Sequence, residues 1–328
     1  MKQFFYLENL AAINDKNFGE LALKTFQHQA KNCEPYRNFI FLLGTNVESV
    51  ENYTQIPSLP IEFFKFEKVY SGVLNPVLTF ASSSTTGSIP SSHYIKNPAI
   101  YEQSFLTHFR SVYGETTEYV ILGLLPSYLE RPGSSLVYMV DHLVRLSGKP
   151  ESGFFMTDYA RLNKTIQQLL AEKKKFILFG VTYALVDFAS LYELNLEGNI
   201  VIETGGMKGR KEEMTRSALH DLLKERFHLS SIHSEYGMTE LLSQAYATAP
   251  GKFKSPPWMR VTVRDVNDPF SILPENQTGG LNIIDLANYD SCSFIATDDL
   301  GKINSDGSFD VLGRFDNSDI RGCSLLSI

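Results

Sequence analysis

The sequence has few cysteines and no long apolar run, and both absences restrict the class of protein. Its three cysteines (Cys33, Cys292 and Cys323) are an odd number without CxxC spacing, so they suggest neither a disulfide framework nor a zinc site. One of them can still be a reactive thiol. No stretch approaches the ~18 apolar residues of a membrane span, and the first residues, MKQFFYLENL, lack the apolar segment of a secretion signal. We therefore expect a cytoplasmic protein without a membrane span.

Positive charge is also scarce. The 328 residues include 30 basic and 37 acidic side chains, which gives a net charge of -7, and the basic residues form only short runs such as Lys173–Lys175. This argues against nucleic-acid binding and favours a small-molecule or protein substrate. With 43% hydrophobic residues, the chain is able to bury a substantial core as one large domain or two coupled lobes.

In the middle of the chain, short apolar runs alternate with amphipathic segments. Tyr119–Leu124, Phe176–Gly180 and Asn199–Glu203 have the composition of buried strands. Ser134–Leu146 and Leu162–Glu172 lie between them and have helical periodicity. Alternation of this kind predicts an α/β fold with a largely parallel sheet flanked by helices.

The two ends of the chain have different patterns. Residues 1–80 contain helices with loops, and we expect this segment to pack on an α/β core over residues 81–255. Within that core, a further helix is expected over Lys211–Phe227 and a short strand over Ser230–Ser234. Alternating runs and Gly/Asp turns predict a β-rich, antiparallel subdomain over residues 256–328.

A hydroxyl-rich loop, Ser82–Ser88, follows the apolar stretch Val73–Ala81. Hydroxyls and free backbone N–H groups on such a loop can donate hydrogen bonds to phosphate oxygens. The alternative is a solvated linker. The loop is not of the Walker type, since no GK[ST] follows it.

A glycine pair, Gly205 and Gly206, follows the strand predicted at Asn199–Glu203. Adjacent glycines let the backbone approach a ligand closely, and ligands usually sit at strand ends in open α/β sheets. The alternative is a tight turn with Lys208 and Arg210 exposed.

The segment Tyr236–Glu240 combines a ring, a hydroxyl and a carboxylate within five residues. These groups can stack on a base, contact a phosphate and hold Mg²⁺. The alternative is a helix start with Thr239 as its cap.

A fourth segment, Thr297–Gly301, is followed by Gly313–Asp316. Its carboxylates are suited to bind a ribose diol, and Arg314 can add a donor from the opposite side. The alternative is a pair of ordinary hairpin turns.

Taken in order, the Ser/Thr/Gly loop, the GG turn, YGMTE, TDDLG and GRFD resemble the core motifs of adenylate-forming enzymes, the superfamily of acyl-CoA synthetases and luciferases. The chain is most similar to the acyl-protein synthetases of bacterial luminescence and their phenylacetate-CoA ligase relatives. The segments that carry this likeness are ETGGMKGR, YGMTEL and IPSLPIEFFK. The resemblance covers nearly the whole chain and implies the large N-terminal domain fold of these enzymes, in which residues 81–255 would bind the nucleotide and the acyl group.

The resemblance implies two cofactors, ATP and Mg²⁺. The residues that it assigns to ATP are Ser82, Ser83, Ser84, Thr85, Thr86, Gly87, Gly205, Gly206, Tyr236, Gly237, Thr239, Asp299 and Arg314. Around the phosphates, Ser82–Gly87 would close over the β- and γ-phosphates, with Thr85 and Thr86 as donors. Thr239 would contact the α-phosphate, and Glu240 would coordinate the metal.

The nucleoside end of the implied site comes from other segments. Gly205 and Gly206 would border the adenine, and Tyr236 would lie against the base. Asp299 would hold the ribose hydroxyls, assisted by Arg314.

The implied reaction activates a carboxylic acid, expected to be a fatty or aryl acid, as an acyl-AMP and passes the acyl group to a thiol. The catalytic residues would be Thr239, Glu240 and Cys323. The luminescence synthetase is thought to use a cysteine near its own C-terminus, and Arg321 would favour the Cys323 thiolate. The alternative for Cys323 is a small side chain packed in a terminal strand. The acceptor thiol can also belong to a partner protein, an acyl carrier protein or CoA.

The chain departs from the family pattern in three places. Ser84 stands where the loop usually has glycine, and Pro90–Ser92 stand where a lysine is common. After Asp316 most members carry a mobile C-terminal domain with a further lysine, whereas this chain ends at Ile328. We therefore keep two alternatives to an acyl-protein synthetase: an acyl- or aryl-CoA ligase, and a non-catalytic nucleotide-binding subunit of a biosynthetic assembly.

Overall fold

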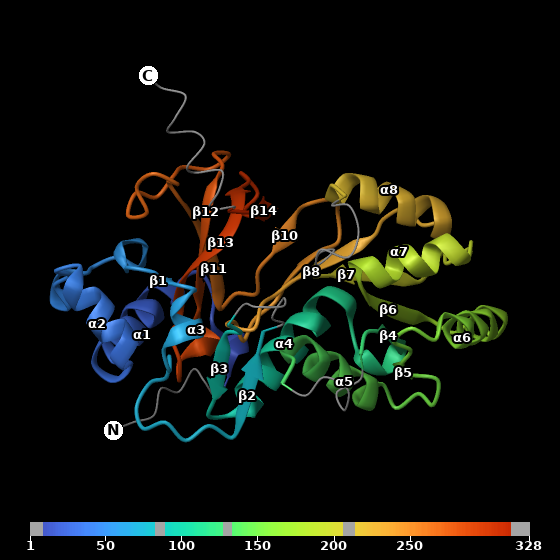
Figure 1. The fold of residues 1–328 in the computed structure, drawn as a ribbon, viewed down its shortest axis with the longest axis horizontal. Helices are drawn as coiled ribbons and strands as arrows, with labels where there is room; N and C mark the ends of the chain where they lie inside the picture. Colours follow the sequence, from blue (N-terminus) through green and yellow to red (C-terminus); the bar gives the residue numbers. More distant parts are fainter. Residues whose placement is uncertain (1–8, 83–88, 127–132, 206–213, 316–328) are drawn as a thin grey trace.

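The computed structural model describes residues 9–82, 89–126, 133–205 and 214–315. Within these ranges the chain forms helices around one long mixed sheet (Figure 1). The α-helices are α1 (Phe18–Asn32), α2 (Glu34–Leu42), α3 (Phe63–Phe66), α4 (Pro98–Tyr113), α5 (Ser135–Ser147), α6 (Tyr159–Ala171), α7 (Thr182–Leu191) and α8 (Arg216–Phe227). The strands are β1 (Leu59–Pro60), β2 (Leu78–Ala81), β3 (Ser92–Ile95), β4 (Val120–Leu124), β5 (Gly153–Phe154), β6 (Phe176–Val181), β7 (Ile200–Thr204), β8 (His233–Tyr236), β9 (Ala245–Ala247), β10 (Phe253–Lys254), β11 (Met259–Arg264), β12 (Gly279–Asp285), β13 (Phe294–Ile303) and β14 (Phe309–Arg314).

The long sheet has a parallel half and an antiparallel half. Its strand order is β11-β12-β13-β14-β10-β9-β8-β7-β6-β4-β5, and β1 pairs with β13. In this order the strands from β8 to β5 are parallel to one another, whereas each pairing from β8–β9 to β12–β11 is antiparallel. The pairing of β1 with β13 is parallel. Both the predicted α/β class and the antiparallel ending are confirmed.

The parallel strands form where the sequence has continuous apolar runs. Every residue of β4 and β6 is buried, which is what a strand covered on both faces requires. In Figure 1, α7 and α8 lie together on one side of these strands and α4 and α5 lie on the other. The carboxyl ends of β6, β7 and β8 therefore lie side by side between two helical layers.

Two predicted elements are shifted along the chain. The strand expected at Ser230–Ser234 occupies His233–Tyr236 instead, so its polar residues belong to the sheet. The helix expected from Lys211 begins at Arg216, because the side chain of Thr215 accepts a hydrogen bond from the backbone of Ala218 and caps it.

The N-terminal helices are attached to the antiparallel half. The Gln29 side chain of α1 is fully buried and donates hydrogen bonds to the carbonyls of Asn288 and Tyr289, at 2.9 and 3.0 Å. These carbonyls lie at the end of a short 3₁₀ helix, η6 (Leu286–Asn288). β10 pairs with both β9 and β14, so the sheet runs continuously across the predicted boundary near residue 255.

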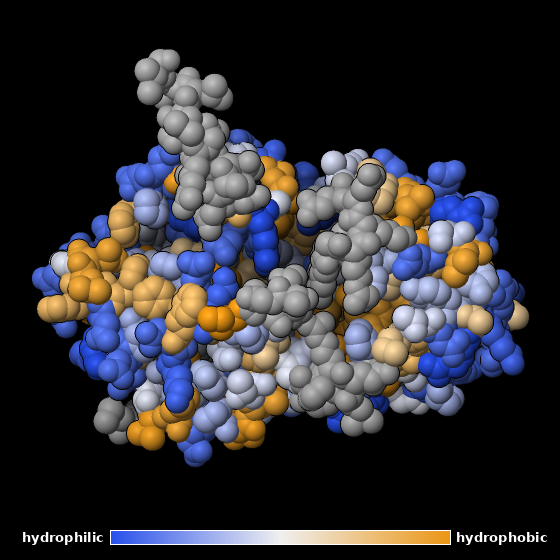
Figure 2. Space-filling model, viewed as in Figure 1, coloured by the Kyte–Doolittle hydropathy of each residue, from blue (hydrophilic) through white to orange (hydrophobic). Residues whose placement is uncertain are grey.

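Apolar residues are exposed at the far end of the molecule from the parallel strands. They gather over α2 in Figure 2, where Phe41 and Leu42 have exposed fractions of 79% and 83%. In the described ranges, no helix combines the length and the apolar character that a bilayer span needs.

Candidate functional site

Three residues from different motifs meet where β8 approaches β13 and β14. The Tyr236 hydroxyl donates to Asp299 Oδ2 at 2.7 Å, and Arg314 Nε lies 3.3 Å from Asp299 Oδ1. Asp299 and Arg314 face each other across the β13–β14 register, which explains their proximity. The Asp299 side chain is 10% exposed, whereas that of Arg314 is 78% exposed. The site is thus a buried carboxylate with an arginine at its solvent side.

The ring of Tyr236 is held by two aromatic neighbours. Its centroid lies 5.8 Å from that of Phe253 and 5.6 Å from that of Phe309. Burial and the nearby charge of Asp299 raise the pKa of Tyr236 well above its usual value. The hydroxyl is therefore a neutral donor that orients the carboxylate.

The segment Thr239–Glu240 lies in the connection between β8 and β9. Glu240 is 5% exposed, and this burial raises the pKa of its carboxyl group, while a hydrogen bond from the Ser91 side chain opposes the rise. Ser91 also pairs with Ser82: its N–H donates to Ser82 Oγ at 2.9 Å, and Ser82 N–H donates to its carbonyl at 3.0 Å. The start of the predicted phosphate loop and the predicted metal ligand are thus connected through Ser91.

Gly237 separates Tyr236 from this segment, and the space around it requires glycine. A Cβ atom at this position would lie 2.5 Å from Glu235 Oε1 and 3.3 Å from Gln244 Cγ. Because both neighbours are buried, a side chain here would displace the turn.

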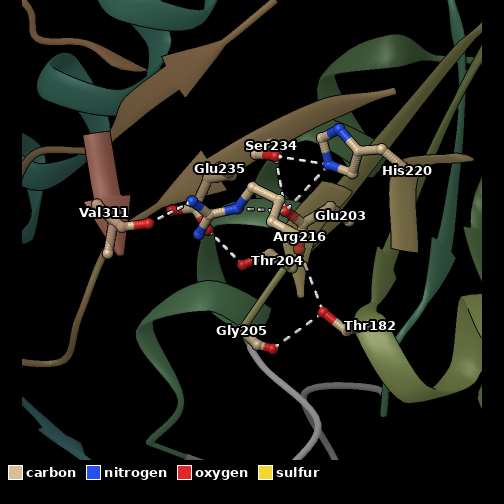
Figure 3. Close-up of polar contacts among 9 residues, drawn as sticks. All are labelled: Thr182, Glu203, Thr204, Gly205, Arg216, His220, Ser234, Glu235 and Val311. Carbon is tan, nitrogen blue, oxygen red and sulfur yellow. Dashed lines mark hydrogen bonds and ion pairs between the residues drawn. The ribbon is translucent and has the colours of Figure 1, made fainter. Parts of the chain in front are cut away.

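Near the end of β7, two residues before Gly205, Glu203 is the centre of a buried polar cluster (Figure 3). Its carboxylate accepts from the hydroxyls of Thr182 at 3.2 Å and Ser234 at 2.6 Å. Nε2 of His220 and Nε of Arg216 each lie 3.6 Å away. Burial alone would raise the pKa of Glu203, but the hydrogen bonds from His220 and Ser234 and the charge of Arg216 outweigh it, so the pKa is lowered.

This cluster fixes the end of β7 from two directions. The Thr182 hydroxyl also lies 3.3 Å from the Gly205 carbonyl, and Arg216 Nη1 donates to the Val311 carbonyl of β14 at 2.7 Å. Gly205 has a φ of +62°, a left-handed conformation that favours glycine. The predicted adenine turn and the strand that carries Arg314 are therefore joined by one polar network.

Glu235 is a second buried carboxyl, on the opposite face of β8. It accepts a hydrogen bond from Thr204, its partner in the β7–β8 register. Burial raises the pKa of Glu235 to about 7, against the smaller effect of the Thr204 hydrogen bond.

Several predicted site residues lie outside the described ranges. These are Ser83, Ser84, Thr85, Thr86, Gly87, Gly206 and Cys323. The other two cysteines are buried, and burial raises the pKa of Cys33 to about 11 and that of Cys292 well above its usual value. Neither thiol is suited to act as a nucleophile.

The sequence did not identify the residues that support the site. Ser91, Arg216, His220 and Glu235 were assigned no role, yet each contacts a motif residue or its neighbour. One signal was present: the glutamate that ends the apolar run NIVIE is a charge in a buried strand, and such a charge needs partners.

Glu240 is the one side chain among the described residues that we predict as a ligand of a metal at this site. Among the described residues, no three His, Cys, Asp or Glu side chains form a cluster able to hold a metal ion. Mg²⁺ is commonly bound by one or two carboxylates together with substrate phosphates. A single carboxylate at Glu240 therefore fits Mg²⁺ bound with ATP.

Several solved structures have a fold similar to that of this chain. A 2-hydroxyisobutyryl-CoA ligase, in complex with its acyl-AMP and CoA, is 14% identical, and the match covers 92% of this chain and 70% of that one, with a TM-score of 0.69. ATP-bound MatB from Rhodopseudomonas palustris is 18% identical over 74% of this chain, with a TM-score of 0.56. The amide bond synthetase McbA from Marinactinospora thermotolerans is 18% identical over 72%, with a TM-score of 0.50.

These likenesses show the fold, and they confirm the fold that the motifs implied. The chain spans about half the length of MatB, at 49%, and of McbA, at 48%. A search of curated proteins finds no match.

The family is shown by the sequence itself. The model of the family described as acyl-protein synthetase, LuxE, matches residues 140–327, which is more than half of the chain. This match includes the glycine pair Gly205 and Gly206, the Tyr236–Glu240 segment, Asp299 and Arg314. The chain belongs to the LuxE acyl-protein synthetase family.

Proposed function

We propose that this protein uses ATP to convert a carboxylic acid into an acyl-AMP and then transfers the acyl group to a thiol. The observation that carries the proposal is the meeting of Tyr236, Asp299 and Arg314 from three separate segments. Family membership and the shared fold with ligases that bind ATP or acyl-AMP support it.

In the first half-reaction, an oxygen of the substrate carboxylate attacks the α-phosphorus of ATP. The bond from the α-phosphorus to the bridging oxygen breaks, and pyrophosphate leaves with the electron pair. Asp299 accepts hydrogen bonds from the ribose hydroxyls and so places the α-phosphate. Thr239 donates to an α-phosphate oxygen. Glu240 would hold Mg²⁺, which when bound neutralises charge on the phosphates.

In the second half-reaction, a thiolate attacks the acyl carbon and AMP leaves, so that a thioester remains. We propose Cys323 as the acceptor, since burial makes Cys33 and Cys292 poor nucleophiles. Fatty or aryl acids are the proposed substrates, and the cytoplasm is the proposed location. CoA, an acyl carrier protein or another partner protein is the alternative acceptor, and the likeness to a CoA ligase favours testing CoA first.

Pyrophosphate exchange into ATP tests the first half-reaction. We expect exchange that depends on an added acid, in a panel of fatty and aryl acids of graded length. Exchange with no acid of the panel would contradict the proposal. ATP binding without turnover would instead favour a nucleotide-binding subunit.

Thioester labelling tests the acceptor. With a radiolabelled acid and ATP, we expect label on the wild-type protein, no label on Cys323→Ser, and unchanged label on the control Cys33→Ala. Label that persists in Cys323→Ser would remove Cys323 from the mechanism. Discharge of the adenylate by free CoA, with no label on the protein, would identify a CoA ligase.

A further inference from the structure

Two side chains outside the motifs hold the main chain of Thr239 and Glu240. Nδ1 of His93, in β3, lies 2.8 Å from the Thr239 carbonyl oxygen. Nδ2 of Asn288, in η6, donates to the Glu240 carbonyl at 2.7 Å. Both side chains are fully buried. We call His93 and Asn288 the carbonyl clamp.

The clamp binds a part of the chain that the sheet leaves unpaired. Residues 237–244 connect β8 to β9 and belong to neither strand. Asp285 fixes the following turn, since its carboxylate accepts from Leu242 N–H at 2.9 Å and from the Ser243 hydroxyl at 2.6 Å. A carbonyl oxygen only accepts hydrogen bonds, so Nδ1 of His93 must carry the proton in this contact.

The clamp leaves polar atoms without partners, which simple packing would avoid. Within the described residues, Nε2 of His93 and Oδ1 of Asn288 make no hydrogen bond. Both residues line one small cavity. Unsatisfied buried polar atoms are unfavourable, so an apolar residue would serve better at either position if filling space were the only requirement. The donors toward Thr239 and Glu240 are the feature that an apolar residue would lack.

His93 also connects this segment to the predicted phosphate loop. It pairs with Phe80 in the β2–β3 register, and β2 and β3 flank the loop that begins at Ser82. The rings of Phe64 and His93 pack in an edge-to-face arrangement, with centroids 5.7 Å apart and planes at 87°. The ring therefore has little freedom to rotate. A hydrogen bond from it fixes the Thr239 carbonyl relative to both β2 and β3.

We propose that His93 and Asn288 are positioning residues that hold Thr239 and Glu240 in place at the phosphates of ATP during adenylation. This inference rests on the proposed function. The clamp touches neither Tyr236, Asp299 nor Arg314, so its loss leaves the nucleoside contacts intact. Loss of the clamp should therefore lower the rate of the chemical step much more than it weakens the binding of ATP.

The test is pyrophosphate exchange by three variants of His93 in the full chain. His93→Phe keeps a ring against Phe64 but removes the donor. We expect kcat to fall by about 100-fold, as for a small misplacement of reacting groups, while KM for ATP changes by less than about threefold.

His93→Asn and His93→Gln form the matched pair. The asparagine amide nitrogen is bonded to Cγ, as is Nδ1 of histidine, whereas that of glutamine takes the place of Nε2. We expect His93→Asn to retain kcat within about tenfold of the wild type and His93→Gln to fall as far as His93→Phe. Thermal unfolding measured in parallel should give similar midpoints for the asparagine and glutamine variants.

Each outcome separates this inference from the proposed function. Wild-type protein without exchange on any acid would overturn both. Exchange in the wild type that persists within about threefold in His93→Phe and His93→Gln would overturn the positioning role alone. Unfolding midpoints of His93→Asn and His93→Gln that both lie far below that of the wild type would also overturn it, because the ring would then be required for packing.

Discussion

Asp299→Asn should weaken ATP binding with little effect on folding. The substitution keeps the shape of a side chain that accepts from Tyr236 and Arg314 and removes its charge. A hydrogen bond to a charged group contributes about 1.5–3 kcal/mol, so loss of the charge under the ribose diol should raise KM for ATP roughly 10- to 100-fold.

The stability of the protein should change much less. The Arg314 side chain is 78% exposed, and an exposed ion pair contributes roughly 0–1 kcal/mol. The Tyr236 hydroxyl can still donate to the amide oxygen of asparagine. We therefore expect the free energy of unfolding to fall by about 1 kcal/mol or less.

The assay compares ATP with 2′,3′-dideoxy-ATP in pyrophosphate exchange. If Asp299 binds the diol, removal of both hydroxyls should weaken wild-type binding by a similar factor, and the variant should discriminate little between the two nucleotides. If the two losses are additive, Asp299→Asn and the wild type will show the same ratio of affinities for ATP and dideoxy-ATP. That result would refute the assignment of Asp299 to the ribose.

Two further predictions concern the turn at Gly237 and its neighbour. Gly237→Ala should lower the free energy of unfolding by about 1–3 kcal/mol, because its Cβ would meet Glu235. Urea denaturation measures this change. The control is Gly153→Ala, where a Cβ meets no atom within 4 Å and the free energy of unfolding should change little. Glu235 has a pKa raised from 4.5 to about 7, so its contribution to stability is complete below about pH 4.5 and is lost as the pH rises through about 7. Glu235→Gln should therefore gain up to about 3 kcal/mol relative to the wild type between pH 5 and pH 8. A pH-independent difference between the two proteins would contradict this.

The central strands were predictable because burial on both faces leaves a direct trace in the sequence. β4, β6 and β7 follow the apolar runs closely. β8 was placed three residues too early because His233, Ser234 and Glu235 are polar, and their burial depends on partners from other elements. Two-residue strands such as β1 and β10 have no periodicity to detect.

The site residues were predicted from motif order, and their surroundings were not. Tyr236, Asp299 and Arg314 were expected around one nucleoside, and the structure brings them together. The roles of these residues toward ATP stay predictions. The contacts of His93 with Thr239 and of Asn288 with Glu240 span 146 and 48 residues along the chain. No local pattern specifies such pairs, because they depend on how the sheet brings distant segments together.

The most direct test of the account is a crystal structure with a non-hydrolysable acyl-AMP analogue of an acid that supports exchange. We predict that the ribose hydroxyls lie about 3 Å from the Asp299 carboxylate and that the Thr239 hydroxyl lies at the same distance from the phosphate mimic. An analogue bound elsewhere, with Asp299 and Thr239 both out of hydrogen-bond reach, would contradict the account.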